Sequence, residues 1–125
     1  MRGSLIKFSN LNDLRKMSST TCRVAVLQMT STSDKVRNRQ KCEELLRKAK
    51  NYGAQAAFLP EAFDFIGEST EQTSQLAEHL NEKNGTIENY QKLASELTMS
   101  LSLGGFHERL KNENTKLGNT HVMIG

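Results

Sequence analysis

Two short apolar runs flank an amphipathic stretch in the first half of the chain. Residues 23–29 form an apolar run rich in β-branched side chains, and residues 54–59 form a second apolar run. Between them, from Asp34 to Asn51, apolar residues recur at helical spacing among charged ones. A strand–helix–strand succession with short connections favours two parallel strands joined by a right-handed crossover. The pattern therefore predicts an α/β fold with two buried strands.

The residues between these elements predict where each one starts and stops. Ser33 can cap the helix through its hydroxyl, and Gly53 suits the left-handed position after a helix. Pro60 ends the second strand, because it has no N–H for the ladder and keeps Leu59 extended. Glu61 is then expected at the carboxyl end of a parallel strand, where open α/β sheets place their ligands.

The second half of the chain alternates helical and extended patterns again. It predicts a short helical stretch at 73–80, a turn at 84–85, a helix at 86–95, a strand at 100–106, a hairpin-like connection at 108–118 and a strand at 120–124. The chain ends at Gly125 directly after an apolar strand, and Val122–Ile124 is expected to form an exposed strand edge. We interpret the chain as the N-terminal part of a longer domain.

Residues 1–21 have the composition of a leader rather than of a fold. They carry four basic residues and one acidic residue, together with serines and apolar residues at three-residue spacing. That mixture resembles a mitochondrial transit peptide, and a disordered leader fits equally well. Met17 could start a second, cytosolic form. We expect residues 22–125 to form the folded part, in the cytoplasm, the mitochondrion or both.

Charge is divided unequally along the chain. Residues 1–50 carry twelve Lys/Arg and four Asp/Glu, whereas residues 51–125 carry five and ten. Most of the positive charges from Lys35 to Lys50 fall at helical spacing, which is typical of a solvated helix face. Nucleic-acid binding is the weaker alternative, since no aromatic-rich strand or binding signature accompanies the charge. We therefore expect no nucleic-acid partner. No apolar run approaches the ~20 residues of a membrane helix, so we expect no membrane partner either.

The two cysteines do not indicate a metal or disulfide site. Cys22 and Cys42 form no C-x-x-C motif, and the three histidines are widely spaced. Both thiols are expected to be buried packing groups, as suits a reducing compartment. No phosphate-binding loop, dinucleotide fingerprint or zinc helix is present, and we expect neither a cofactor nor a metal.

Glu61 is the strongest candidate for chemistry. Among Phe58, Phe63 and Phe65 its carboxylate is expected to be partly desolvated, which would move its pKa toward neutrality and suit a general base. A surface glutamate in a turn is the alternative, and a side chain pointing into bulk water would argue against the catalytic role. Phe63, Phe65 and His107 are candidate pocket residues; hydrophobic packing and a local hydrogen bond are their alternatives.

Four segments in order resemble the carbon–nitrogen hydrolase domain of the nitrilase superfamily. They are Val24–Met29, Phe58–Gly67, Leu101–Arg109 and Asn119–Val122, and the likeness extends from Arg23 to Gly125. The chain most resembles the branch that includes deaminated glutathione amidase and the nitrilase half of nitrilase–Fhit fusion proteins. Four ordered motifs are far more specific than any one of them.

The resemblance implies a four-layer α-β-β-α sandwich, of which this chain supplies the N-terminal half, and a homo-oligomeric parent. It also implies a Glu-Lys-Cys triad that hydrolyses a small ω-amide, with deaminated glutathione as the expected substrate. Glu61 matches the family's base, while the lysine and the cysteine find no counterpart, so we expect these 125 residues to be inactive alone. The alternative is a non-catalytic isoform or pseudo-enzyme that binds a partner through its unfinished sheet.

Overall fold

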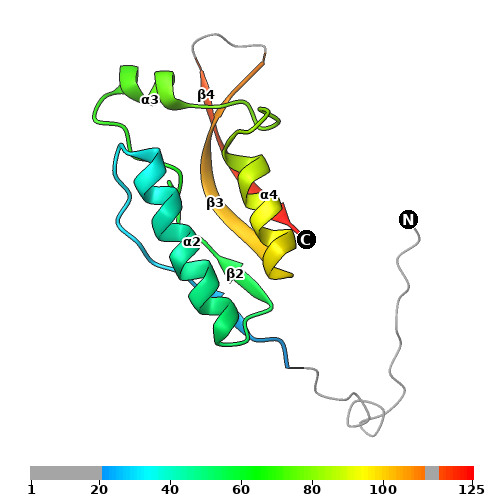
Figure 1. The fold of residues 1–125 in the computed structure, drawn as a ribbon. Coiled ribbons are helices and arrows are strands. Elements are labelled where there is room, and N and C mark those ends of the chain that lie inside the picture. The colour runs from blue at the N-terminus through cyan, green and yellow to red at the C-terminus, as the bar shows by residue number, and fades with distance from the viewer. Residues whose placement is uncertain (1–20, 112–115) are drawn as a thin grey trace, which may run out of the picture.

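The computed structural model describes residues 21–111 and 116–125 and confirms an α/β fold (Figure 1). Its elements are β1 Val24–Val26, α2 Lys35–Asn51, β2 Ala56–Phe58, α3 Thr70–Leu76, α4 Thr86–Leu97, β3 Ser100–Arg109 and β4 Leu117–Ile124. The strands form one sheet in the order β1-β2-β3-β4, with β1, β2 and β3 parallel and β4 antiparallel to β3. Apart from Thr21, the expected leader lies outside the described residues.

The parallel pairing follows from the two helical crossovers. Helix α2 connects β1 to β2 and α4 precedes β3, and both helices lie over the same face of the sheet (Figure 1). Their apolar stripes pack on alternate strand residues such as Ala57, Leu101 and Leu103, which are fully buried. These contacts make a two-layer unit with one core. None of the helices in the described ranges is long and apolar enough to cross a membrane.

The opposite face of the sheet is uncovered by the described residues. Val26 is 81% exposed, Met123 65% and Phe58 41%, and their registered pairing places all three on this open face. The expectation of two fully buried first strands was therefore wrong. Alternation sends every second side chain away from α2 and α4, so helices on one face bury only half of each strand.

The helix boundaries differ from the predictions at their caps. Asp34, not Ser33, caps α2 by accepting a hydrogen bond from the Arg37 amide at 3.0 Å. Helix α3 begins at Thr70 instead of residue 73, because the Ser69 hydroxyl accepts from the Gln72 amide at 3.1 Å. The expected helix at 86–95 extends to Leu97 as α4. Gly53 has the expected left-handed conformation, with φ of 81°.

The strand boundaries were also misplaced. Strands β1 and β2 are shorter than the apolar runs that predicted them, whereas β3 continues to Arg109 and β4 starts at Leu117. Pairing between the last residues of β3 and the first of β4 shortens the expected 108–118 connection. Cross-strand hydrogen bonds thus extend the hairpin through polar residues that the apolar pattern left out.

The two cysteines have different environments. Cys42 is buried as expected, with its Sγ 3.0 Å from Sδ of Met29. Cys22 is exposed, which contradicts the expectation of a buried thiol, because it precedes β1 and no residue of the described ranges buries it. Both are free thiols.

Candidate active site

The segment after β2 is held against a bulge in β3. Between Leu103 and Phe106 the pairing with β4 shifts, so β3 carries one extra residue there. A Cβ on Gly104 would lie 2.3 Å from the Pro60 carbonyl oxygen, so only glycine allows this approach. The Ala62 amide then donates to the Gly105 carbonyl oxygen at 3.1 Å. Glu61 is thereby fixed at the carboxyl end of β2, as the sequence predicted.

Asn119 is the hydrogen-bond partner of Glu61. Its Nδ2 donates to Glu61 Oε1 at 2.9 Å, and both residues are exposed. Asn119 belongs to β4 and alternates with His121 and Met123, which puts the pair on the open face of the sheet. A Cβ on Gly105 would overlap the Asn119 side chain. Sequence reasoning missed this role, although Asn119 opens one of the four family-like segments.

The expected desolvation of Glu61 is not found. Glu61 is exposed, while Phe63 and Phe65 are fully buried. After Ala62, whose φ is 53°, the chain turns the Phe63 ring into the core under α2 and α4, while the Phe65 ring packs against His107. Phe58 stays on the open face and is itself 41% exposed. The two buried phenylalanines therefore pack inside the protein and do not enclose the Glu61 carboxylate.

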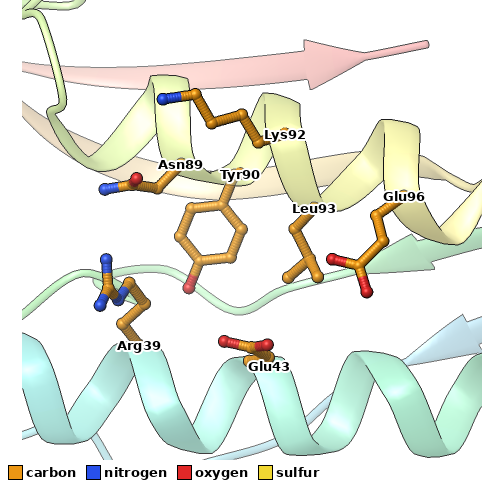
Figure 2. Close-up of a pocket in the computed structure, with 7 residues that line it drawn as sticks. All are labelled: Arg39, Glu43, Asn89, Tyr90, Lys92, Leu93 and Glu96. Carbon is orange, nitrogen blue, oxygen red and sulfur yellow. The ribbon is translucent and has the colours of Figure 1, made fainter.

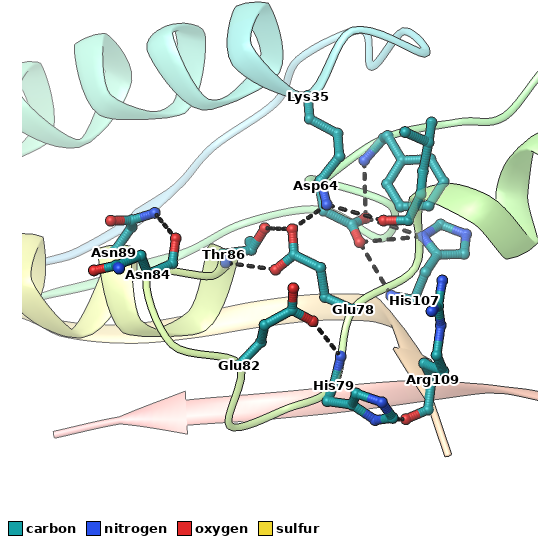
Figure 3. Close-up of polar contacts among 12 residues, drawn as sticks. Lys35, Asp64, Glu78, His79, Glu82, Asn84, Thr86, Asn89, His107 and Arg109 are labelled. Atoms are coloured by element: carbon teal, nitrogen blue, oxygen red, sulfur yellow. Dashed lines mark hydrogen bonds and ion pairs between the residues drawn. The ribbon is translucent and has the colours of Figure 1, made fainter. Parts of the chain in front are cut away.

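The buried side of the same loop is anchored by Asp64 and His107 (Figure 3). The Asp64 carboxylate is 1% exposed, and it accepts from the Phe65 amide at 2.9 Å and the His107 amide at 3.1 Å. His107 Nδ1 lies 3.0 Å from Asp64 Oδ1, and its ring packs 4.4 Å from that of Phe65, centroid to centroid. His107 lies within β3, not after it as expected, and its partner is 43 residues away.

A second polar cluster ties α2 to the start of α4. Lys35 forms an ion pair with Glu78 and donates to the Leu76 carbonyl oxygen at 2.9 Å. Glu78 also accepts from the Thr86 amide at 2.6 Å (Figure 3). Burial alone would raise the pKa of Glu78, but the donors from Lys35 and Thr86 outweigh it and lower the pKa. The cluster therefore favours the ionised form of the Glu78 carboxyl group.

The candidate pocket residues divide between two places. Phe65 and His107 lie together beside Asp64, and Phe63 meets Tyr90 edge to face with centroids 5.2 Å apart. Phe63 also lines a cavity between α2 and α4. Phe63 belongs to the core under the helices, a position that suits packing behind Glu61.

The chemistry available at this site is that of a base. Asn119 engages one Glu61 oxygen and leaves the other to accept a proton. Cys42 does not serve as its nucleophile. Burial raises the pKa of that thiol, and its sulfur lies in the core, 3.9 Å from the Phe63 carbonyl oxygen. In the described ranges, no group of three or more His, Cys, Asp or Glu side chains could hold a metal.

Comparison with known proteins assigns this geometry to a family. Residues 23–125 match the family model described as carbon–nitrogen hydrolase. The chain belongs to the carbon–nitrogen hydrolase family. It is 47% identical over 113 residues to human deaminated glutathione amidase, covering 86% of this chain and 34% of that relative. This carbon–nitrogen hydrolase thus spans about a third of the relative's length.

Solved structures agree with that assignment. The crystal structure of the Caenorhabditis elegans NitFhit protein superposes with a TM-score of 0.73 at 35% identity, over 81% of this chain and 24% of that one. Nit3 of Saccharomyces cerevisiae, a member of the nitrilase superfamily, has a TM-score of 0.63 at 23% identity over 81% of this chain and 38% of that one, and so shares the fold. The expected nitrilase-type fold is confirmed for the part of it that this carbon–nitrogen hydrolase chain supplies.

Proposed function

We propose that residues 23–125 form the glutamate-bearing part of an amidase that hydrolyses a small ω-amide, with deaminated glutathione as the substrate. Glu61 takes the proton of a cysteine thiol, and the thiolate attacks the amide carbon to give a thioester and ammonia. A lysine stabilises the tetrahedral oxyanion, and water then releases the acid and restores the thiol. The relatives named deaminated glutathione amidase support this substrate.

One observation carries the proposal. Glu61 lies at the carboxyl end of parallel β2, on the open face of the sheet, with one oxygen held by Asn119 and the other available. A nucleophile and a cation carried by another layer can approach a base so placed. In our proposal, lysine and cysteine come from outside these 125 residues, and the chain alone is inactive.

A chimera tests the proposal. Residues 23–125 would replace the matching segment of human deaminated glutathione amidase, and ammonia release from deaminated glutathione would be measured. We expect an active chimera and a loss of at least a thousandfold in kcat on Glu61→Gln. Glu71→Gln, an exposed glutamate in α3, is the matched control and keeps full activity. Activity that survives Glu61→Gln would overturn the role of Glu61.

A second candidate function is a protein-interaction module, favoured by the apolar side chains of the open face. Val26 and Met123 have no cover from the described residues, and sheets with such faces bury them against a partner. Size-exclusion chromatography should then give a defined oligomer that Val26→Lys disrupts. Val36→Lys is the control, since Val36 is 59% exposed on α2. Aggregation unaffected by either substitution counts against a specific module.

The cellular location is proposed from residues 1–21 alone. We propose a mitochondrial form that starts at Met1 and a cytoplasmic form that starts at Met17. Fusing residues 1–21 to a fluorescent reporter tests this: mitochondrial fluorescence lost on replacing the four basic residues supports it, and diffuse fluorescence contradicts it. The parent is proposed to be a homo-oligomer, which sedimentation of the chimera would test.

A further inference from the structure

The groove between α2 and α4 contains two adjoining cavities of about 210 and 320 Å³. Both are lined by Arg39 from α2 and by Asn89 and Tyr90 from α4. Figure 2 shows the Tyr90 ring standing between the helices with its hydroxyl directed toward α2, between Arg39 and Glu43. The groove lies on the helix side of the sheet, whereas Glu61 lies on the open face.

The Tyr90 hydroxyl is a buried donor with no oxygen or nitrogen acceptor among the described residues. Tyr90 is 2% exposed, and its hydroxyl has no hydrogen-bond partner of acceptable geometry within the described residues. Burial raises the pKa of this phenol, and the neighbouring Cys42 thiol adds to the effect, so the hydroxyl keeps its proton. A buried hydroxyl is normally hydrogen-bonded, which makes this one conspicuous. What would satisfy it is an acceptor.

Arg39 places a positive charge beside that donor. Four carboxylates also line the two cavities: Glu43 and Glu96 share an ion pair with Arg47, Glu78 pairs with Lys35, and Asp64 accepts from the His107 amide. Lys92 pairs with Glu88. The Arg39 guanidinium has no ion pair or hydrogen bond to any residue in 21–111 or 116–125. Because Arg39 is exposed and unengaged, it can turn inward without losing a partner.

We propose that this groove binds an oxyanion, a carboxylate or a phosphate group, between the Arg39 guanidinium and the Tyr90 hydroxyl. Guanidinium forks bind such groups through two parallel N–H donors, and a protonated phenol adds a third. Asn89 lines both cavities, where its amide can add a polar contact to the ligand. The site is separate from Glu61, so it does not depend on the proposed amidase activity.

Anion titrations of the ¹⁵N-labelled chain test the site. Sodium phosphate and sodium acetate are added in separate series at ionic strength held constant with sodium chloride, and amide and Arg Nε–H shifts are followed by NMR. We expect saturable shifts along the groove with a Kd in the millimolar range or below. Saturation by phosphate alone assigns a phosphate ligand, and saturation by acetate alone assigns a carboxylate.

Three variants separate a built site from diffuse attraction to a basic helix. Arg39→Gln should raise Kd at least tenfold, and Tyr90→Phe should raise it several-fold. Arg37→Gln, two residues away on α2 and outside both cavities, should leave Kd within twofold. Equal effects of Arg37→Gln and Arg39→Gln, an unchanged Kd in Tyr90→Phe, or no saturation by either anion would overturn the proposal. The chimera described above contains the same groove and allows the titration if the 125-residue chain aggregates.

Discussion

Two carboxylates three residues apart, Glu61 and Asp64, belong to opposite sides of the molecule. Asp64 is buried on the helix side, where its oxygens meet the amides of Phe65 and His107 and the His107 ring. Glu61 is exposed on the open face with a single hydrogen bond from Asn119. The network around Asp64 therefore holds the loop in place, whereas Glu61, the residue proposed for chemistry, contributes little to folding.

The largest expected effect separates these two carboxylates. Asp64→Ala removes the acceptor of the Phe65 and His107 amides and the contact with the His107 ring, and we expect it to lower the free energy of unfolding by about 3 kcal/mol or more. Glu61→Ala removes an exposed side chain and should change it by less than about 0.5 kcal/mol. Urea unfolding followed by circular dichroism measures both values. Similar losses in the two variants would contradict the division between the sides.

Substituting the two glycines of the β3 bulge, Gly104 and Gly105, should give the next largest loss of stability. In Gly104→Ala the new Cβ would meet the Pro60 backbone, which cannot move cheaply, so we expect a loss of about 1–3 kcal/mol. In Gly105→Ala the obstacle is the exposed Asn119 side chain, which can rotate away. That variant should lose less stability but break the contact between Asn119 and Glu61, as the Asn119 side-chain NH₂ signals would report.

The sequence predicted most of what lies on the helix side and much less of the open face. Helical spacing in α2 and α4 and the apolar runs of the strands reflect burial, so element order and parallel pairing followed from them. The partners of Glu61 and Asp64 did not follow. Asn119 and His107 come from a hairpin whose register depends on a bulge, and a bulge moves every later side chain by one position.

The error about Glu61 has a related cause. Its neighbours Phe63 and Phe65 are close in sequence, and that proximity suggested shielding of the carboxylate. After the left-handed turn at Ala62, both rings are fully buried, Phe63 in the core and Phe65 against His107, and neither shields the exposed Glu61. The family assignment stands despite the exposure of Glu61, because it rests on the match over residues 23–125.

A smaller effect should appear in the pH dependence of stability. The pKa of Glu78 is lowered in the folded chain, so the folded state binds fewer protons than the unfolded state near pH 4.5, the ordinary value for a glutamate. The stabilisation is present above that pH and is lost as the pH falls through the lowered pKa. We expect the free energy of unfolding to drop as the pH falls below about 4.5, and to drop less steeply in Glu78→Gln.

Lys35→Gln provides a second test of the same pH dependence. Lys35 donates to Glu78 and lowers its pKa, so its removal should also flatten the profile. A profile in Glu78→Gln as steep as that of the unaltered chain would show that other carboxylates carry the acid sensitivity. The pair would then be a minor part of the network on the helix side.

The smallest effect concerns the Tyr90 hydroxyl, the buried side-chain oxygen that lacks a hydrogen-bond partner within the described residues. Removing the Tyr90 hydroxyl removes a buried donor that has no partner, so Tyr90→Phe should leave stability unchanged or raise it by up to about 1 kcal/mol in chloride buffer. Tyr52→Phe, at a tyrosine 68% exposed, is the control and should have no effect. In phosphate, the unaltered chain should gain stability relative to Tyr90→Phe, because bound anion stabilises only the folded state. A loss of more than about 1 kcal/mol in chloride would instead mean that the Cys42 thiol already accepts from this hydroxyl, since a net hydrogen bond contributes about that much.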